Sequence, residues 1–281
     1  MTKFFHALDN ARLAYRDQGA GVPILCLAGL TRGQNDFDAL WRAFDGAANG
    51  VRFISMDYRG RGASDFTGAR TYSVEQEAAD ALQLLDHLSL PKAAILGTSR
   101  GGLIGLLLSA TAASRISGLC LNDIGPEINP DALARIAKHV GVKPKARDFA
   151  GFADDLEKSQ AGFKNIPQDR WLAEAKRLSL HTPNGLELTY DPALKNAVLQ
   201  SMATPAPDLW PFFIQYAPKV LALIHGLNSD LLTEDTVIKM RTLRPDMIYG
   251  GVPDRGHIPF LDEPESLRAL KAFVTALKEN A

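Results

Sequence analysis

Four short apolar runs, the last three separated by helical segments, constrain the fold of this chain most strongly. The runs are PILCLAG (23–29), RFISMDY (52–58), AAILG (93–97) and SGLCLND (117–123). Continuous apolar runs of this length are typical of strands buried on both faces of a parallel sheet. Helical patterns at 73–89 and 100–114 complete a βαβα alternation. We therefore predict an α/β fold with helices on both faces of the sheet.

The alternation is interrupted once. Two strands, 4–8 and 11–17, open the chain as a hairpin, and the pattern of strand and helix resumes from 219. Between 125 and 218 we find helical segments, loops and many aromatic residues, but no convincing buried strand. We predict an α/β core formed by residues 1–124 and 219–281, with a helical cap at 125–218.

Composition limits the classes of function. The chain has 281 residues, 46% of them hydrophobic, and a net charge of −1, which is ordinary for a globular protein and gives no attraction to nucleic acid. Cys26 and Cys120 lie inside apolar runs, which favours buried free thiols. The N-terminus lacks a signal peptide pattern and no apolar run is long enough to span a bilayer. We expect a cytoplasmic protein with a small-molecule substrate and no membrane partner, and the oligomeric state stays open.

The segment GTSRGG (97–102) lies between a predicted strand and a predicted helix. G-x-S-x-G in this position is the nucleophile elbow, a turn so tight that the residues two positions from the serine must be small. Ser99 is therefore the candidate nucleophile. A structural Gly-Ser turn is the alternative.

A serine nucleophile needs a base and an acid that orients the base. His257, in the loop before the last helix, is the candidate base, and His225 is the alternative. Asp230 follows a predicted strand and gives the chain order Ser, Asp, His, so it is the expected acid. Asp123, at the end of the preceding strand, is the alternative acid.

Two backbone amides, those of Leu30 and Arg100, are the expected oxyanion donors. Arg100 lies at the N-terminus of the helix that follows Ser99, and Leu30 lies in the loop after the strand PILCLA. Arg32 could bind a substrate carboxylate or form a salt bridge at the rim. At least one of three aromatic residues near the end of the cap is expected to line the substrate pocket, with packing inside the cap as the alternative: Trp210, Phe212 and Phe213. No metal-binding or nucleotide-binding motif is present, so we expect no cofactor and no metal.

Four motifs occur in order: GTSRGG, DYRGRGASD (57–65), HGLNSDLL (225–232) and GHIPFLDEPE (256–265). Together they resemble the α/β-hydrolase superfamily over nearly the whole chain. The resemblance implies a mostly parallel eight-stranded sheet with a helical cap. It is closest to the capped group that holds enol-lactonases, carboxylesterases and carbon–carbon bond hydrolases. Many relatives carry His-Gly in the oxyanion loop, where this chain has Ala28-Gly29.

We expect a serine hydrolase that cleaves small esters or lactones through an acyl-enzyme, because an aromatic cap favours an enclosed apolar pocket. Two alternatives remain. The same triad could cleave a carbon–carbon bond in a β-diketone-like acid. The fold could also act as a non-catalytic binding protein for a small molecule.

Overall fold

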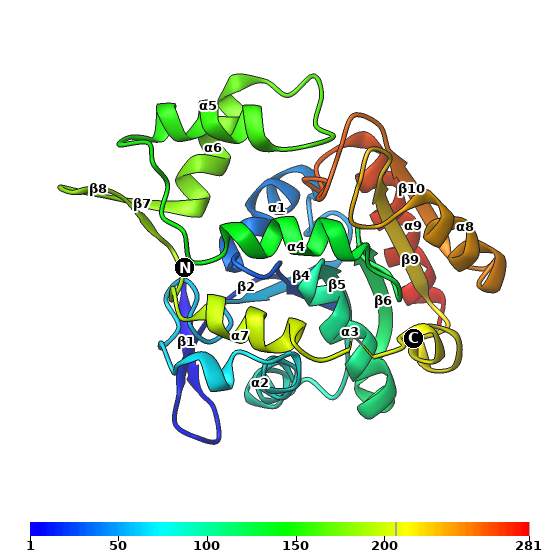
Figure 1. Ribbon diagram of the computed structural model, residues 1–281. Helices are drawn as coiled ribbons and strands as arrows, with labels where there is room; N and C mark the ends of the chain where they lie inside the picture. Colours follow the sequence, from blue (N-terminus) through cyan, green and yellow to red (C-terminus); the bar gives the residue numbers. More distant parts are fainter. Residues whose placement is uncertain (206, 281) are drawn as a thin grey trace.

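A computed structural model describes residues 1–205 and 207–280. Its main sheet has eight strands in the order β1-β2-β4-β3-β5-β6-β9-β10 (Figure 1). The strands from β4 to β10 in this order are parallel, and β2 joins them antiparallel. The bounds are β1 Lys3–His6, β2 Arg12–Gly19, β3 Val22–Leu27, β4 Val51–Met56, β5 Ala93–Thr98, β6 Ile116–Asn122, β9 Leu221–Gly226 and β10 Ile248–Val252. The predicted α/β-hydrolase fold, with a mostly parallel eight-stranded sheet, is confirmed.

Helices cover both faces of this sheet, and the alternation of strand side chains explains why. In β3, Leu25 and Leu27 face the apolar cluster that includes α2 and α3, whereas Ile24 and Cys26 face the cluster that includes α1 and α9. The α-helices are α1 Asp38–Phe44, α2 Val74–His87, α3 Arg100–Thr111, α4 Pro130–His139, α5 Phe149–Ser159, α6 Gln168–Leu178, α7 Leu194–Met202, α8 Glu234–Leu243 and α9 Pro264–Glu279. Short helical turns are η1 Gln34–Phe37, η2 Ala69–Thr71, η3 Ala113–Arg115 and the π-helical η4 Phe212–Tyr216.

Two capping and turn residues show why particular elements begin or turn where they do. Ser73 caps α2, because its hydroxyl accepts a hydrogen bond from the Gln76 amide at 3.2 Å. The β1–β2 hairpin turns at Asn10, which has φ 67° and whose amide donates to the Ala7 carbonyl at 2.8 Å. Asparagine tolerates this left-handed conformation better than most residues, which suits it to the turn.

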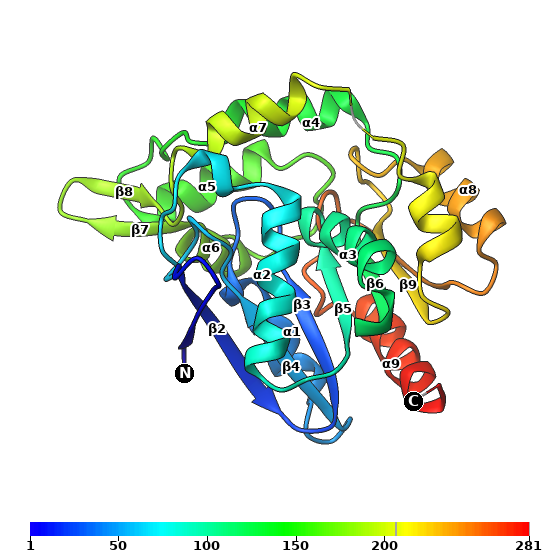
Figure 2. The same cartoon turned by 90° about the horizontal axis from the view of Figure 1, so that it is seen from below.

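The segment between β6 and β9 contains α4, α5, α6, α7 and a short antiparallel pair of strands, β7 Ser179–Thr182 with β8 Gly185–Leu188. These two strands form a sheet of their own, apart from the main sheet. In Figure 2 the green-to-yellow α4 and α7 lie across one end of the strands, with β7 and β8 projecting to one side. The division of the chain into core and cap at 125 and 218 stays a prediction.

The two cysteines are free and buried, as their apolar surroundings predict, and burial raises the pKa of both thiols. Every helix in the described part of the chain is too short or too polar to span a bilayer. The predicted cytoplasmic location stays untested.

Candidate active site

The sheet register brings two of the expected side chains together. Thr98, the last residue of β5, pairs with Asn122, the last residue of β6. Ser99 and Asp123 are therefore the next residues on neighbouring parallel strands. The loop after β10 carries His257 to the same edge, since the carboxyl ends of parallel strands meet there.

Ser99 occupies a strained turn. Its backbone has φ 50° and ψ −115°, far from the regions that most residues adopt. A Cβ at Gly97 would lie 2.5 Å from the Gly101 carbonyl carbon, and one at Gly101 would collide with the Leu27 carbonyl. The geometry confirms that both neighbours must be glycine.

His257 links the serine to a carboxylate. Its Nε2 lies 2.9 Å from Ser99 Oγ, and its Nδ1 lies 2.8 Å from Asp123 Oδ2. The His257 side chain is 13% exposed and that of Asp123 is fully buried. With Nδ1 donating to the carboxylate, Nε2 is left to accept the proton of the serine hydroxyl.

Asp123 is held by two further donors. The Gly226 amide donates to Oδ1 at 2.8 Å, and the Ser229 hydroxyl donates to Oδ2 at 2.6 Å. Together with His257, these bonds compensate for the removal of the carboxylate from water. The sequence suggested that the loop after β9 provides the acid, Asp230. In the structure this loop instead provides hydrogen-bond donors to Asp123.

The prediction that Asp230 is the acid is therefore wrong in this structure. Asp230 lies beyond the Ser229 turn, where its side chain is 40% exposed and pairs with Arg135 at 2.5 Å. A carboxylate in this position is screened by water and has no contact with His257 in the described residues. The alternative acid, Asp123, occupies the position beside the imidazole.

The alternative base, His225, lies in the interior of the sheet. Its Nδ1 contacts the Tyr249 hydroxyl at 3.2 Å and its Nε2 contacts the Leu232 carbonyl at 3.1 Å. Both ring nitrogens are occupied by structural partners, so His257 is the histidine that meets the serine.

The two expected oxyanion donors lie on either side of Ser99 in the fold. Arg100 is the first residue of α3, where the helix N-terminus favours negative charge. A Cβ at Gly29, next to Leu30, would lie 3.9 Å from Ser99 Cβ, so this loop approaches the serine closely. Within residues 1–205 and 207–280, neither the Leu30 nor the Arg100 amide donates a hydrogen bond to a protein acceptor. Their role as oxyanion donors stays a prediction.

Arg32 is engaged by protein carboxylates. Its Nη1 donates to Asp36 at 2.6 Å and to Glu174 of α6 at 3.0 Å. This is the salt-bridge alternative of the sequence analysis, and it connects the oxyanion loop to the segment between β6 and β9. A substrate carboxylate would have to displace two existing partners.

Phe213 packs in the interior, which is the alternative given for it in the sequence analysis. The expectation that at least one of the three aromatic residues lines the substrate pocket stays a prediction for Trp210 and Phe212. Phe213 is fully buried in the apolar cluster that includes α3, and the Trp210 ring packs against it edge-on with centroids 6.1 Å apart. Trp210 also donates to Glu127 at 3.2 Å. Phe212 is half-buried and contacts the Tyr216 ring, with centroids 6.2 Å apart.

Replacing Phe213 by alanine is expected to destabilise the protein by about 3–5 kcal/mol, because a large buried ring leaves a cavity. The relative kcat/KM values for esters of different acyl length should remain unchanged. Denaturant unfolding and a series of p-nitrophenyl esters measure both quantities. Phe212→Ala is the matched control, with a smaller loss of stability. A Phe213→Ala protein of normal stability but altered acyl preference would contradict this placement.

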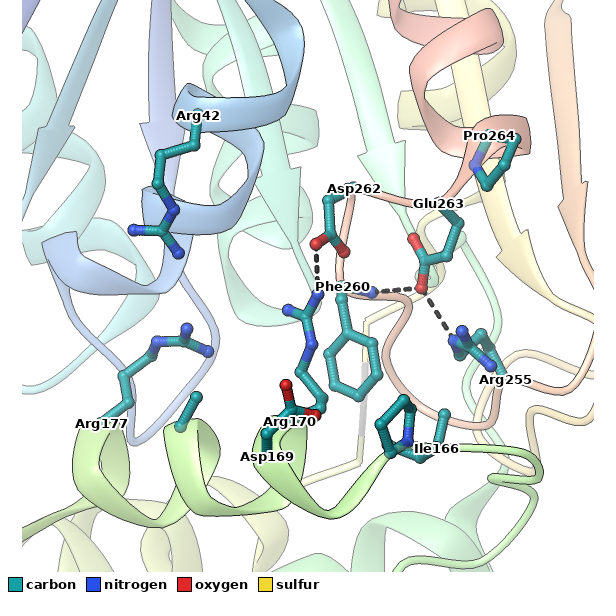
Figure 3. A pocket seen from close by; sticks show the side chains of 12 residues that line it. Arg42, Ile166, Asp169, Arg170, Arg177, Arg255, Phe260, Asp262, Glu263 and Pro264 are labelled. Atoms are coloured by element: carbon teal, nitrogen blue, oxygen red, sulfur yellow. Dashed lines mark hydrogen bonds and ion pairs between the residues drawn. The ribbon is translucent and has the colours of Figure 1, made fainter.

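A cavity of about 480 Å³ lies between α1, α6 and residues 255–264, the segment that carries His257 (Figure 3). Four arginines line it, but three of them already have carboxylate partners: Arg170 pairs with Asp262, Arg177 with Glu174 and Arg255 with Glu263. Asp169 lines the cavity as well. The charges that line the cavity are therefore nearly balanced. Of the three pairs, Arg170–Asp262 joins α6 to the loop that carries His257, whereas the other two lie within α6 and within that loop.

The profile of the α/β hydrolase fold family matches residues 22–264. Together with the sheet order and the turn at Ser99, this match shows that the chain belongs to the α/β hydrolase fold family.

Among its relatives, the chain is 32% identical to the 3-hydroxybutyrate-oligomer hydrolase of Cupriavidus necator, over 94% of this chain and 93% of that protein. It is also 32% identical to 3-oxoadipate enol-lactonase 2 of Acinetobacter baylyi, over 36% of this chain and 42% of that protein. The crystal structure of an α/β hydrolase from Novosphingobium aromaticivorans superimposes with a TM-score of 0.89, at 33% identity and with 98% of both chains covered.

Proposed function

We propose that this protein is a serine hydrolase that cleaves carboxylic ester bonds through an acyl-enzyme. The observation that carries the proposal is the hydrogen-bonded chain from Ser99 Oγ through the His257 ring to Asp123. A nucleophile, a base within hydrogen-bond reach and a group that orients the base are the three parts that this chemistry needs.

In the first half-reaction, Ser99 Oγ bonds to the acyl carbon while its proton passes to His257 Nε2. Asp123 holds the imidazole in the required tautomer and stabilises the imidazolium. The bond to the alcohol then breaks as the same proton passes to the leaving oxygen. In the second half-reaction, a water molecule gives a proton to His257 Nε2 while the water oxygen bonds to the acyl carbon. The bond from the acyl carbon to Ser99 Oγ then breaks as His257 returns the proton to Ser99 Oγ, and the carboxylic acid product leaves.

Esters of short hydroxy acids are the substrate class that we propose first. The support is the 32% identity, across nearly the full length of both chains, to a hydrolase named for 3-hydroxybutyrate oligomers. An oligomer of that acid is a chain of ester bonds, which suits the proposed chemistry. The enol-lactonase relative matches a shorter part of the chain, so lactones are the second substrate to assay.

A substrate panel tests this proposal. Linear 3-hydroxybutyrate dimer and trimer, p-nitrophenyl esters, a γ-lactone and a vinylogous β-diketone acid are compared by the acid released, with the Ser99→Ala protein as the blank. We expect the highest kcat/KM among the esters. Fast cleavage of the diketone with poor ester turnover would replace ester hydrolysis by carbon–carbon bond hydrolysis. Tight binding without turnover of any compound would favour a binding protein.

A further inference from the structure

A buried ion cluster connects the two residues that carry the expected oxyanion amides. We call Arg61, Arg100 and Glu77 the Glu77 cluster. Glu77 lies fully buried in the first turn of α2. Its Oε1 is 2.8 Å from Arg61 Nη1, and its Oε2 accepts from Arg100 Nε at 2.5 Å.

On one side, the cluster holds the Leu30 loop. Arg61 Nε donates to the Leu30 carbonyl at 3.0 Å, and Arg61 Nη1 donates to the Arg59 carbonyl at 2.6 Å. The Gly29 carbonyl accepts from the Arg32 amide at 3.2 Å. Because the N–H and C=O of a trans peptide point in opposite directions, this bond turns the Leu30 N–H the other way. The carbonyls on both sides of the Leu30 amide are thus held by hydrogen bonds.

On the other side, the cluster holds the start of α3. Arg100 Nη2 donates to the Tyr72 carbonyl at 2.9 Å, and Arg100 Nε donates to Glu77. These bonds use only the Arg100 side chain and leave its backbone amide available. The Glu77 carboxylate of α2 therefore contacts both arginines, Arg61 beside the Leu30 amide and Arg100 at the start of α3.

We propose that Glu77 is a positioning residue for the oxyanion hole: it sets the separation of the Leu30 and Arg100 amides through the two arginines. The inference rests on the proposed function. Oxyanion donors act at 2.7–3.1 Å from the oxygen, and a misplacement of about 1 Å costs on the order of 10²-fold in rate. The ion pair of Glu77 with Arg61 and its hydrogen bond from Arg100 Nε provide a link between the two donors that limits such a misplacement.

An electrostatic role for the cluster makes the opposite prediction. Two guanidinium groups and one carboxylate leave the cluster with excess positive charge. Replacing Glu77 by glutamine raises that positive charge, which by itself would stabilise a developing oxyanion and increase the rate. Positioning instead requires that the same change slows the reaction.

Glu77→Gln is therefore expected to lower kcat by about 10- to 100-fold with little change in KM, since the donors act mainly in the transition state. The affinity for a trifluoromethyl ketone, which forms a tetrahedral adduct with the serine, should fall by a similar factor. Single-turnover acylation of the enzyme by a p-nitrophenyl ester measures the chemical step directly.

Asp80→Asn is the matched control. Asp80 lies one turn further along α2, is also fully buried, and accepts from Arg59 Nε at 2.6 Å and Nη2 at 2.7 Å. We expect a comparable loss of melting temperature but a kcat within about twofold of wild type, because Arg59 donates no side-chain hydrogen bond to the Leu30 loop among the described residues. Arg61→Lys is a second test variant, which keeps the charge but removes the Nε donor, and should also lower kcat.

The outcomes separate the two proposals. A Glu77→Gln protein that matches Asp80→Asn in kcat, or that is faster than wild type, would overturn the positioning role while ester hydrolysis stands. If Glu77→Gln does not fold, an unchanged kcat and inhibitor affinity in Arg61→Lys would overturn it. Full activity in the Ser99→Ala protein would instead remove the proposed function itself.

Discussion

Replacing Asp123 by asparagine is expected to lower kcat by about 10³- to 10⁴-fold in a protein that remains folded. The amide nearly matches the carboxylate in shape, so the space between β6 and His257 stays filled. An amide that donates to Nδ1, however, favours the tautomer with the proton on Nε2. That tautomer cannot accept the proton from Ser99 Oγ, which lies 2.9 Å away.

Asp230→Asn is the control for this prediction, because it replaces a carboxylate by an amide in the same way, in the loop after the neighbouring strand β9. Its carboxylate faces Arg135 and solvent, and an exposed ion pair contributes about 0–1 kcal/mol, so activity should stay near wild type. Rapid-quench measurement of acylation compares both variants. A larger loss in Asp230→Asn than in Asp123→Asn would show that the active conformation uses the later aspartate.

Ser99→Ala is expected to abolish labelling by a fluorophosphonate and to lower kcat by about 10⁶-fold, as in other hydrolases that lose their nucleophile. Alanine has a Cβ like serine, so the cost of the backbone conformation with φ 50° is the same in both proteins. The fold should therefore be unchanged, and the loss should come from the missing Oγ alone.

Ser229→Ala is the matched serine variant in the same site. Its hydroxyl donates to Asp123 Oδ2 at 2.6 Å, so its removal should cost about tenfold in kcat. The protein should still be labelled at Ser99. Mass spectrometry of the labelled peptide identifies the modified residue. Labelling at Ser229, or undiminished labelling of Ser99→Ala, would contradict the assignment of the nucleophile.

The sequence was sufficient to predict the sheet and the strained turn at Ser99, because both depend largely on local patterns. Apolar runs such as ILCL and AAIL have the composition of buried strands, and the structure places them in β3 and β5. Gly97 is required by backbone contacts within the turn, and Gly101 by the close approach of the Leu27 carbonyl at the end of β3. The exact limits of elements were less certain, and α1 was not predicted.

The choice of acid could not be made from the sequence, because Asp123 and Asp230 both follow buried strands. The distance from each carboxylate to the His257 imidazole depends on the direction in which the backbone leaves its strand. Asp123 is the first residue after β6, with φ 53°, which turns it towards His257. Asp230 comes after the turn in which the Ser229 amide bonds to the Gly226 carbonyl at 2.8 Å. The immediate position of Asp123 after an apolar run was the available signal.

The Glu77 cluster and the position of Phe213 depend on contacts between distant elements. A glutamate beside Ala78 and Ala81 on the apolar side of α2 was a visible anomaly. Its partners, however, come from separate elements: Arg61 from the loop after β4 and Arg100 from the start of α3. Likewise, aromatic composition does not distinguish a pocket from a packed interior. Phe213 packs against α3, a contact that sequence periodicity does not report.

The position of the acid has a consequence for engineering by loop exchange. The proposed nucleophile and acid, Ser99 and Asp123, share one contiguous βαβ module, β5–α3–β6, which ends before the helices between β6 and β9 begin. That segment instead contacts the loop that carries the proposed base, His257. The Lys164 amide donates to the Asp254 carbonyl at 3.0 Å, and Arg170 pairs with Asp262 on the other side of the histidine. Grafting a foreign segment over residues 160–170 would thus perturb how the imidazole is presented. It would also remove the Gly162 carbonyl that accepts from Asn228 Nδ2 at 2.8 Å, in the loop whose Gly226 and Ser229 donate to Asp123. The β5–α3 turn that holds Ser99 would keep its native framework.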